Sequence, residues 1–275
     1  MSTPPVVWTI AGFDPSSGAG ITADLKTISS LDCYGVACIT ALTVQNTLGV
    51  RRVEPVAPQT VRETLQVLLE DFPPSAIKIG MLATSGIATV VADFLDTLPQ
   101  PLCPIILDPI LRSSSGAELL DEAGTAILRT RLLPLATVVT PNCQEAAVLT
   151  TLTADDPEAL AHTLLKLGST AAVVTGGDVA GDDSSDVLAY TLRGVEFLET
   201  LSAPRIHSSS THGTGCAFST AIACFLAPAT PARAASSSIP AAVTSAKLFV
   251  RRAIQCAPGL GHGNGPMGLD HAGCQ

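Results

Sequence analysis

The chain has 275 residues, of which 47% are hydrophobic and 14% are charged. That composition excludes an intrinsically disordered chain, which would combine low hydrophobicity with high charge. A net charge of −9, without any cluster of Lys and Arg, argues against binding to nucleic acid or to an anionic membrane surface. The length suits one large domain, and we assign residues 1–275 to a single domain.

Neither a membrane span nor a secretory signal is expected. The uncharged stretch Gly213–Ala232 has only a short apolar part, Ala217–Ala227, well below the roughly 20 residues that a span needs. The opening Met1–Pro5 contains no basic residue. The eight cysteines show no Cys-x-x-Cys spacing, which favours reduced thiols in a cytoplasmic protein over disulfides or a zinc site.

Apolar, β-branched runs alternate with helical patterns along most of the chain. In chain order, we expect strands at Val6–Ala11, Ala37–Val44, Ala76–Ile79, Pro104–Leu107, Ala136–Thr140 and Ala171–Thr175. The helical patterns between them are Ile21–Leu31, Gln59–Phe72, Ile87–Leu98, Leu119–Leu132 and Glu158–Leu167. Continuously apolar runs are typical of parallel strands that are covered on both faces. The alternation therefore predicts an α/β fold with a mostly parallel central sheet.

The last third of the chain departs from this alternation. Val187–Tyr190 and Gly194–Leu198 predict a short hairpin, and Cys216–Leu226 and Ile239–Cys256 predict two closing helices. We expect a loop over Pro228–Ser238 and an irregular, glycine-rich tail from residue 259 onwards.

Small and polar residues follow six successive predicted strands. These strand ends are Gly12–Gly20, Gln45–Asn46, Gly80–Met81, Asp108–Pro109, Pro141–Asn142 and Gly176–Asp178. Any one of them could be ordinary turn chemistry. Parallel strands, however, direct their carboxyl ends to one edge of the sheet, where ligands bind in α/β folds. The six together predict a binding site at that edge.

The run Gly213-Thr214-Gly215-Cys216 precedes the uncharged helix. Two glycines at a helix N-terminus allow close approach to an anion, and the same helix end would stabilise a Cys216 thiolate. The alternative is a tight turn followed by a small core residue. The position at a helix start favours the anion site.

Asn142 and Glu145 have the spacing of an N-cap residue and its partner in a capping box. The same carboxylate, one turn into a helix at the site edge, could order a magnesium ion through water. The spacing gives about even weight to the two interpretations.

Asp24 falls on the apolar stripe of the first predicted helix, between Ile28 and Leu31. A carboxylate on a buried face is costly unless something binds it. A role near the helix N-terminus is the alternative, but we interpret Asp24 as a ligand contact. The loop Gly12–Gly20 fits neither the dinucleotide nor the Walker glycine pattern, and Asp108 and Met81 are unspecific on their own.

Taken together, these motifs resemble the hydroxymethylpyrimidine/hydroxymethylpyrimidine-phosphate kinases of thiamine biosynthesis, in the ribokinase-like superfamily. The resemblance covers nearly the whole chain. It is carried by the segments Ala11–Thr27, Thr40–Thr47, Lys78–Leu82, Leu107–Pro109, Thr140–Glu145, Thr211–Cys216 and Gly261–His271. It implies a ribokinase-like three-layer sandwich and an ATP- and Mg²⁺-dependent transfer of phosphate. The acceptors would be 4-amino-5-hydroxymethyl-2-methylpyrimidine and then its monophosphate.

The resemblance also implies roles for individual residues. The pyrimidine would be held by Gly12, Asp24, Gln45, Met81 and Ile110. The loop Gly213, Thr214, Gly215 and Cys216 would receive the transferring phosphoryl group, with Cys216 where the sugar kinases of the superfamily have an aspartate base. Asn142 and Glu145 would order magnesium, and Asp108, Thr175 and Gly177 would face the nucleotide. Relatives suggest a homodimer.

Three features depart from the family pattern. Thr175-Gly176-Gly177-Asp178 stands where Lys-Gly-Gly-His is usual, so a cation near the ATP phosphates is replaced and an acid is added. Ser17 replaces a usual glycine, which restricts that turn. We also expect no second catalytic domain. These departures keep two alternatives open, a pyridoxal or pyridoxine kinase and a catalytically weak, pyrimidine-binding paralogue.

Overall fold

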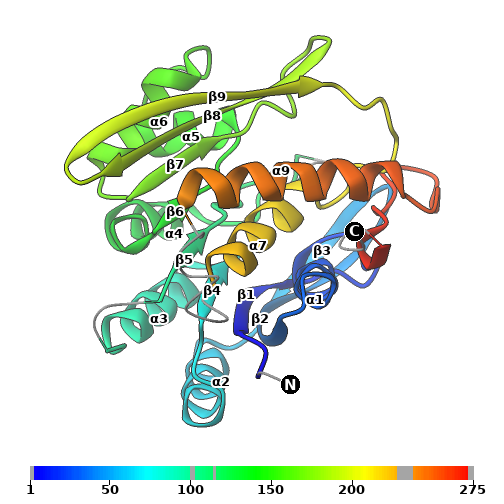
Figure 1. Cartoon of the computed structure of the whole chain (residues 1–275). Helices are drawn as coiled ribbons and strands as arrows, with labels where there is room; N and C mark the ends of the chain where they lie inside the picture. The colour runs from blue at the N-terminus through cyan, green and yellow to red at the C-terminus, as the bar shows by residue number, and fades with distance from the viewer. Residues whose placement is uncertain (1–2, 100–102, 114–115, 228–237, 272–275) are drawn as a thin grey trace.

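The computed structural model describes residues 3–99, 103–113, 116–227 and 238–271. It is built around one nine-stranded sheet with the strand order β3-β2-β1-β4-β5-β6-β7-β8-β9 (Figure 1). The strands are β1 Val6–Phe13, β2 Tyr34–Asn46, β3 Gly49–Pro55, β4 Ala76–Ile79, β5 Ile105–Leu107, β6 Val138–Val139, β7 Ala171–Val174, β8 Asp183–Leu192 and β9 Val195–Pro204. Strands β2, β1, β4, β5, β6 and β7 are parallel, and β3, β8 and β9 pair antiparallel at the two edges.

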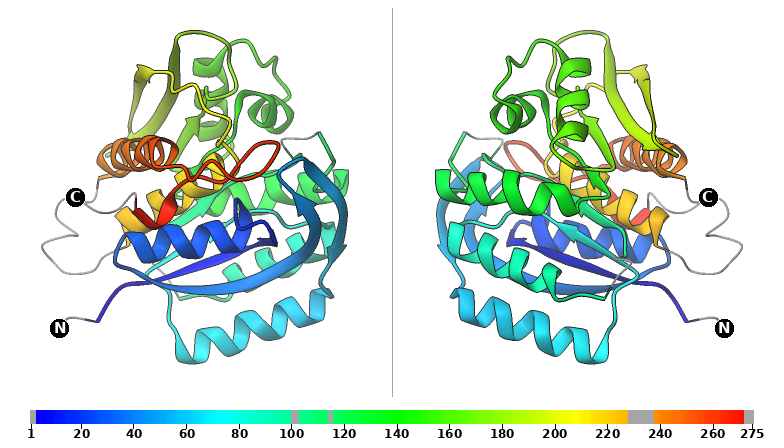
Figure 2. Two further views of the ribbon diagram at one scale, coloured as in Figure 1. Left: turned by 90° about the vertical axis from the view of Figure 1, so that its right-hand side faces the viewer. Right: turned by 90° about the vertical axis from the view of Figure 1, so that its left-hand side faces the viewer.

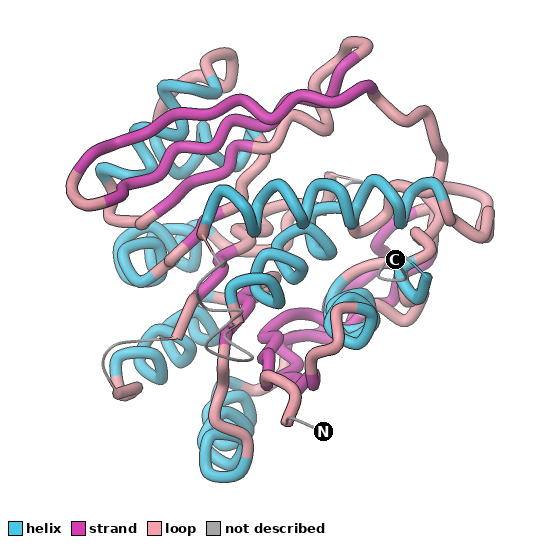
Figure 3. Tube along the Cα trace, in the orientation of Figure 1, coloured by secondary structure: helices cyan, strands magenta, loops and turns pink. Residues whose placement is uncertain are grey.

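Helices cover both sides of the sheet (Figures 2 and 3). They are α1 Gly20–Ser30, α2 Pro58–Asp71, α3 Ser85–Asp96, α4 Glu122–Ile127, α5 Cys143–Thr150, α6 Pro157–Lys166, α7 Thr214–Leu226 and α9 Ile239–Gln255. Alternate strand residues point to opposite faces. Ile77 therefore packs in the core beneath α2, α3, α5 and α6, whereas Ala76 packs in the core beneath α1, α7 and α9.

The sequence-based expectations for this architecture are confirmed in type and order. All six expected parallel strands, the hairpin and the two closing helices are present. Strand β3 was not predicted, because its exposed charged residues Arg51, Arg52 and Glu54 do not give the apolar pattern of a buried strand. The helix expected over Leu119–Leu132 begins only at Glu122 and widens into a π-helical turn at Leu128–Leu132.

Several local ends also differ from, or go beyond, the expectations. The hairpin strands are longer, ten residues each. Almost all of the loop expected over Pro228–Ser238 lies outside the described residues. The tail from Gly259 is irregular as expected, apart from a 3-10 turn at Leu269–His271. Among the described residues, no helix has the length and apolarity needed to cross a membrane.

Candidate active site

A cavity of about 1110 Å³ opens where the parallel strands end. It is lined by residues from the loops after β1, β2, β4, β5, β6 and β7, together with the first turn of α7 and one face of α9. The predicted site residues that line it are Gly12, Gln45, Met81, Asp108, Ile110, Asn142, Glu145, Thr175, Gly177, Gly213, Thr214, Gly215 and Cys216. The convergence of the six strand ends on one edge is therefore confirmed.

Asp24 does not belong to this lining, and its predicted contact with a ligand is wrong. The side chain is 0% exposed. Its carboxylate accepts hydrogen bonds from Thr9 Oγ1 at 2.5 Å, from Thr220 Oγ1 at 2.8 Å and from Lys78 Nζ at 2.9 Å. Asp24 does point inward, as its place on the apolar stripe predicts, but protein groups, not a ligand, compensate the buried charge.

Lys78 joins Asp24 to the floor of the cavity. Its ammonium is 0% exposed and lies 3.9 Å from Asp108 Oδ2, which does line the cavity. Burial lowers the pKa of Lys78, but the negative charge of Asp24 outweighs it and holds the pKa above its usual value. Burial also raises the pKa of Asp108, against the opposing effect of Lys78. Two carboxylates thus share one buried cation beneath the site.

Cys216 sits directly above this charge network. The residue is 8% exposed, lines the cavity and hydrogen-bonds to Asp108 and to the backbone of Gly20. Burial raises the pKa of its thiol to about 12, although Lys78 acts to lower it. The prediction that the helix end gives Cys216 a stabilised thiolate is therefore wrong. This raised pKa favours the thiol over the thiolate.

The loop before α7 is shaped by two glycines with different requirements. Gly213 has φ +79°, and a Cβ there would lie 2.0 Å from the carbonyl oxygen of Gly18. A Cβ at Gly215 would meet no atom within 4 Å, so this position faces open space in the cavity. No side chain caps α7. The backbone N–H of Thr214 donates to the carbonyl oxygen of Thr211 at 3.4 Å. The next N–H groups of the first turn, those of Gly215 and Cys216, have no acceptor within the helix and are available to an anion, and the open space at Gly215 leaves room for a phosphate group.

Asn142 and Glu145 form the capping box that their spacing predicts. Asn142 Oδ1 accepts from the backbone N–H of Glu145 at 2.9 Å, and Glu145 Oε2 accepts from that of Asn142 at 3.0 Å. Burial and, next, Asp108 raise the pKa of Glu145 to about 8. A buried carboxyl beside a second carboxylate is a favourable place for a divalent cation. The described residues contain no three-ligand metal cluster, so this donor set suits an ion held partly by water and phosphate.

One wall of the cavity is apolar and closely packed. A Cβ at Gly12 would lie 2.9 Å from the sulfur of Met81, so only glycine fits this wall without displacing the methionine. Met81 packs with Ala41 and Leu119 in a small cluster that Ile110 extends. Such a closely packed, apolar wall beside the polar end of β2 suits an aromatic ring with polar edges.

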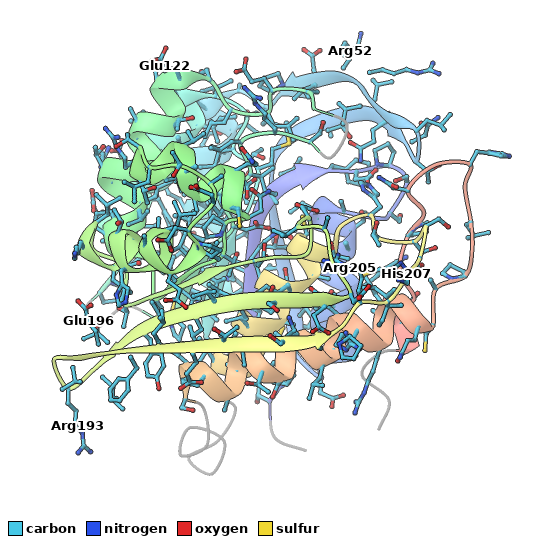
Figure 4. The ribbon with its side chains drawn as sticks, turned by 90° about the horizontal axis from the view of Figure 1, so that it is seen from above. Arg52, Glu122, Arg193, Glu196, Arg205 and His207 are labelled. Atoms are coloured by element: carbon cyan, nitrogen blue, oxygen red, sulfur yellow. The ribbon has the colours of Figure 1, made fainter. Side chains whose placement is uncertain are left out.

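The loop after β7 lacks the cation of the family pattern, and an arginine orders it instead. The guanidinium of Arg205, a residue labelled in Figure 4, donates to three backbone carbonyl oxygens. These belong to Gly177 at 2.6 Å, Gly181 at 2.8 Å and Asp183 at 3.0 Å. Arg205 also lines the cavity. The restricted turn expected at Ser17 is confirmed, because Ser17 adopts φ +61°.

Sequence reasoning missed three residues of the site. Lys78 lies in a predicted buried strand, Ala76–Ile79, and a lysine in a buried strand requires a buried partner of opposite charge. That requirement is the signal that could have identified it. His212 and Asp14 are 198 residues apart and meet at 2.8 Å. Only the topology brings them together, so spacing along the sequence gives no signal for this pair.

The fold and the cavity define a ribokinase-like kinase. Among solved structures, the chain is similar to the pyridoxal kinase of Staphylococcus aureus in complex with ADP, at 31% identity, a TM-score of 0.84 and coverage of 98% and 94% of the two chains. It is also similar to the phosphomethylpyrimidine kinase of Clostridium difficile, at 32% identity and a TM-score of 0.74, covering 91% of this chain and 99% of that one.

The sequence model of the phosphomethylpyrimidine kinase family matches residues 14–268, and the chain belongs to this family. The hydroxymethylpyrimidine/phosphomethylpyrimidine kinase of Synechococcus elongatus is 40% identical over 268 residues, covering 96% of this chain and 97% of that protein. A thiamine biosynthesis bifunctional protein of Geobacter sulfurreducens is 39% identical over 264 residues, and the match covers 95% of this chain. The chain spans about half the length of that protein, 51%.

Proposed function

We propose that the chain transfers the terminal phosphoryl group of ATP to 4-amino-5-hydroxymethyl-2-methylpyrimidine and then to its monophosphate. The observation that carries this proposal is the placement of two features in one cavity. The Gly213–Cys216 loop offers an anion site at a helix end, and the wall formed by Gly12 and Met81 offers an apolar surface for a ring. Family membership supplies the substrate class.

Phosphoryl transfer depends mostly on positioning and on stabilising charge. Gln45, Met81, Ile110 and the backbone of Gly12 hold the pyrimidine so that its hydroxymethyl group faces Cys216. The N–H groups at the start of α7 donate to the phosphoryl oxygens as negative charge develops on them. Lys78 adds a fixed positive charge beneath Asp108 and Cys216.

Deprotonation of the acceptor hydroxyl can occur late in a loose transition state. Cys216 therefore need not be a thiolate before the substrate binds. Its sulfur holds the hydroxyl in place, and its hydrogen bond to Asp108 offers a route for the proton as the bond to phosphorus forms.

ATP and Mg²⁺ are the implied cofactors. The donor set fits them, because Glu145 is a buried carboxyl near Asp108, and Gly215 leaves open space at the helix end. When bound, Mg²⁺ neutralises phosphate charge. Asn142 and Glu145 would hold it through water, and Asp108, Thr175 and Gly177 would face the nucleotide.

A pyridoxal kinase is the second candidate, favoured by the TM-score of 0.84 to the Staphylococcus aureus enzyme. Purified protein with ATP and Mg²⁺ is assayed for ADP release with the pyrimidine, its monophosphate and pyridoxal. We expect the largest kcat/KM for the pyrimidine. A larger kcat/KM for pyridoxal would replace the proposal, and tight pyrimidine binding without ADP release would favour the weak paralogue.

We further propose a cytoplasmic location and a homodimer. None of the seven cysteines among the described residues forms a disulfide, which is typical of a reducing compartment. Leu42, Val44 and Leu48, on β2 and the turn after it, are large exposed apolar side chains that a second copy could cover. Light scattering coupled to size-exclusion chromatography tests the dimer, and a monomeric mass would contradict it.

A further inference from the structure

The imidazole of His212 lies between two polar side chains at the edge of the cavity. Its Nε2 is 2.8 Å from Asp14 Oδ2 and 3.0 Å from Nε2 of Gln45. All three residues line the cavity. One imidazole nitrogen carries at most one hydrogen. It therefore cannot donate to Asp14 and also accept a hydrogen bond from the Gln45 amide.

The ionisation state of Asp14 determines to which neighbour the hydrogen on His212 Nε2 is donated. Its carboxylate accepts hydrogen bonds from the backbone N–H of Ser16 at 2.8 Å and from that of Ala19 at 2.9 Å. Burial opposes ionisation, but the hydrogen bonds from His212 and Ser16 outweigh it and hold the pKa of Asp14 below its usual value. An ionised carboxylate only accepts. The hydrogen on His212 Nε2 therefore points to Asp14.

The imidazole of His212 is packed against the first loop in this position. Its Cδ2 lies 2.3 Å from where a Cβ at Gly18 would be, so the ring packs directly on the glycine of the first loop. The backbone N–H of His212 donates to the carbonyl of Gly265 at 3.1 Å. The side chain is 13% exposed. His212 is thus a fixed donor that Gln45 must accommodate.

Gln45 can accept a hydrogen bond from the N–H of His212 only through its amide oxygen, Oε1. A half-turn about its Cγ–Cδ bond exchanges Oε1 and Nε2 without changing the shape of the side chain. In that orientation Oε1 shares the hydrogen on His212, and the NH₂ group faces away from His212.

We propose that His212, held by Asp14, is a positioning residue that turns the Gln45 amide so that its NH₂ group faces the cavity and donates to an unprotonated ring nitrogen of the substrate. This inference rests on the proposed function, because it specifies how the pyrimidine is read. It selects nitrogen heterocycles with a free lone pair at that point. A ring that presents a hydrogen there would leave two donors facing each other and would bind weakly.

Gln45→Glu tests the orientation directly, because it replaces only one of the two amide atoms. If NH₂ faces the cavity, the variant keeps the oxygen near His212 and loses the donor to the ring. At mildly alkaline pH we expect its Kd for the pyrimidine, measured by calorimetry, to rise at least about tenfold. The KM for ATP should stay within about twofold. Gln66→Glu, on an exposed part of α2, is the matched control for the added charge.

If instead the oxygen of Gln45 faces the cavity, Gln45→Glu preserves the ring contact. A Kd within about twofold of the wild-type value would therefore overturn the proposal. Wild-type protein that neither binds nor phosphorylates the pyrimidine would overturn the proposed function and this inference together. Wild-type protein that does both, beside an unaffected Gln45→Glu variant, would overturn only the inference.

His212 is tested by a pair of variants. His212→Phe removes the donor, whereas His212→Gln keeps an N–H group. For His212→Phe we expect the KM for the pyrimidine to rise at least about fivefold more than kcat falls, with partial recovery in His212→Gln. His207→Gln, on an exposed residue of the same segment, is the control (Figure 4). Equal losses in both His212 variants, confined to kcat, would contradict a positioning role.

Discussion

The buried ammonium of Lys78 offers the sharpest test of how the site is built. Lys78 Nζ lies 2.9 Å from Asp24 Oδ2 and 3.9 Å from Asp108 Oδ2, and both its side chain and that of Asp24 are 0% exposed. Lys78→Met keeps the length of the side chain and removes the charge. Two carboxylates are then left without their cation: Asp24, which is fully buried, and Asp108, which is almost fully buried at the floor of the cavity.

The expected cost follows from this burial. Removing one partner of a buried ion pair costs about 3–5 kcal/mol, because the remaining charge is uncompensated. For a chain of this size each kcal/mol lowers Tm by about 2–4 °C, so we expect a fall of roughly 6–20 °C. Asp24→Asn in the Lys78→Met background removes one of the stranded charges. It should recover at least about half of the loss.

Thermal unfolding of the two variants and of Lys26→Met measures this directly. Lys26 lies on α1 in an exposed pair with Asp270 at 4.0 Å, and its loss should change the free energy of unfolding by less than about 1 kcal/mol. A Lys78→Met protein as stable as Lys26→Met would refute the charge network. So would a double variant less stable than Lys78→Met alone.

Three further predictions concern the site. Gly215→Ala should be as stable as wild type, because its Cβ meets open space, but its kcat/KM for ATP should fall at least about tenfold. Unchanged kinetics would contradict the anion site. Gly213→Ala should be less stable than wild type, because its Cβ would clash with the carbonyl of Gly18. Glu145→Gln should raise the Mg²⁺ concentration needed for half-maximal activity about tenfold, whereas the control Glu158→Gln should not. If the Mg²⁺ concentration needed by Glu145→Gln is unchanged, Glu145 acts only in the capping box of α5. Ser17→Gly should raise the free energy of unfolding by up to about 1 kcal/mol in denaturant titration, and a decrease would show that φ +61° costs nothing there.

Local patterns predicted most of this architecture because parallel strands and amphipathic helices have distinct periods. Continuous apolar runs such as Ala171–Val174 were identifiable as buried strands. Strand β3 was not, because an edge strand is polar on its exposed side and Arg51 and Arg52 resemble a loop.

The site was predicted in part for a similar reason. Strand ends meet at one edge by topology, so Asn142 and Asp108 could be placed together from the sequence. The partner of a buried charge depends on which helix crosses which strand. Asp24 was therefore assigned to a ligand, when Lys78 of β4 and Thr220 of α7 compensate it. The pKa of Cys216 likewise depends on burial, which a motif does not encode.

The most direct measurement compares wild type and Cys216→Ala in steady-state ADP release with ATP, Mg²⁺ and the pyrimidine. If the hydroxymethyl group receives phosphate beside this sulfur, kcat should fall at least about a hundredfold while the pyrimidine KM changes less than about threefold. A Cys216→Ala protein that turns over at the wild-type rate would contradict phosphoryl transfer at this loop.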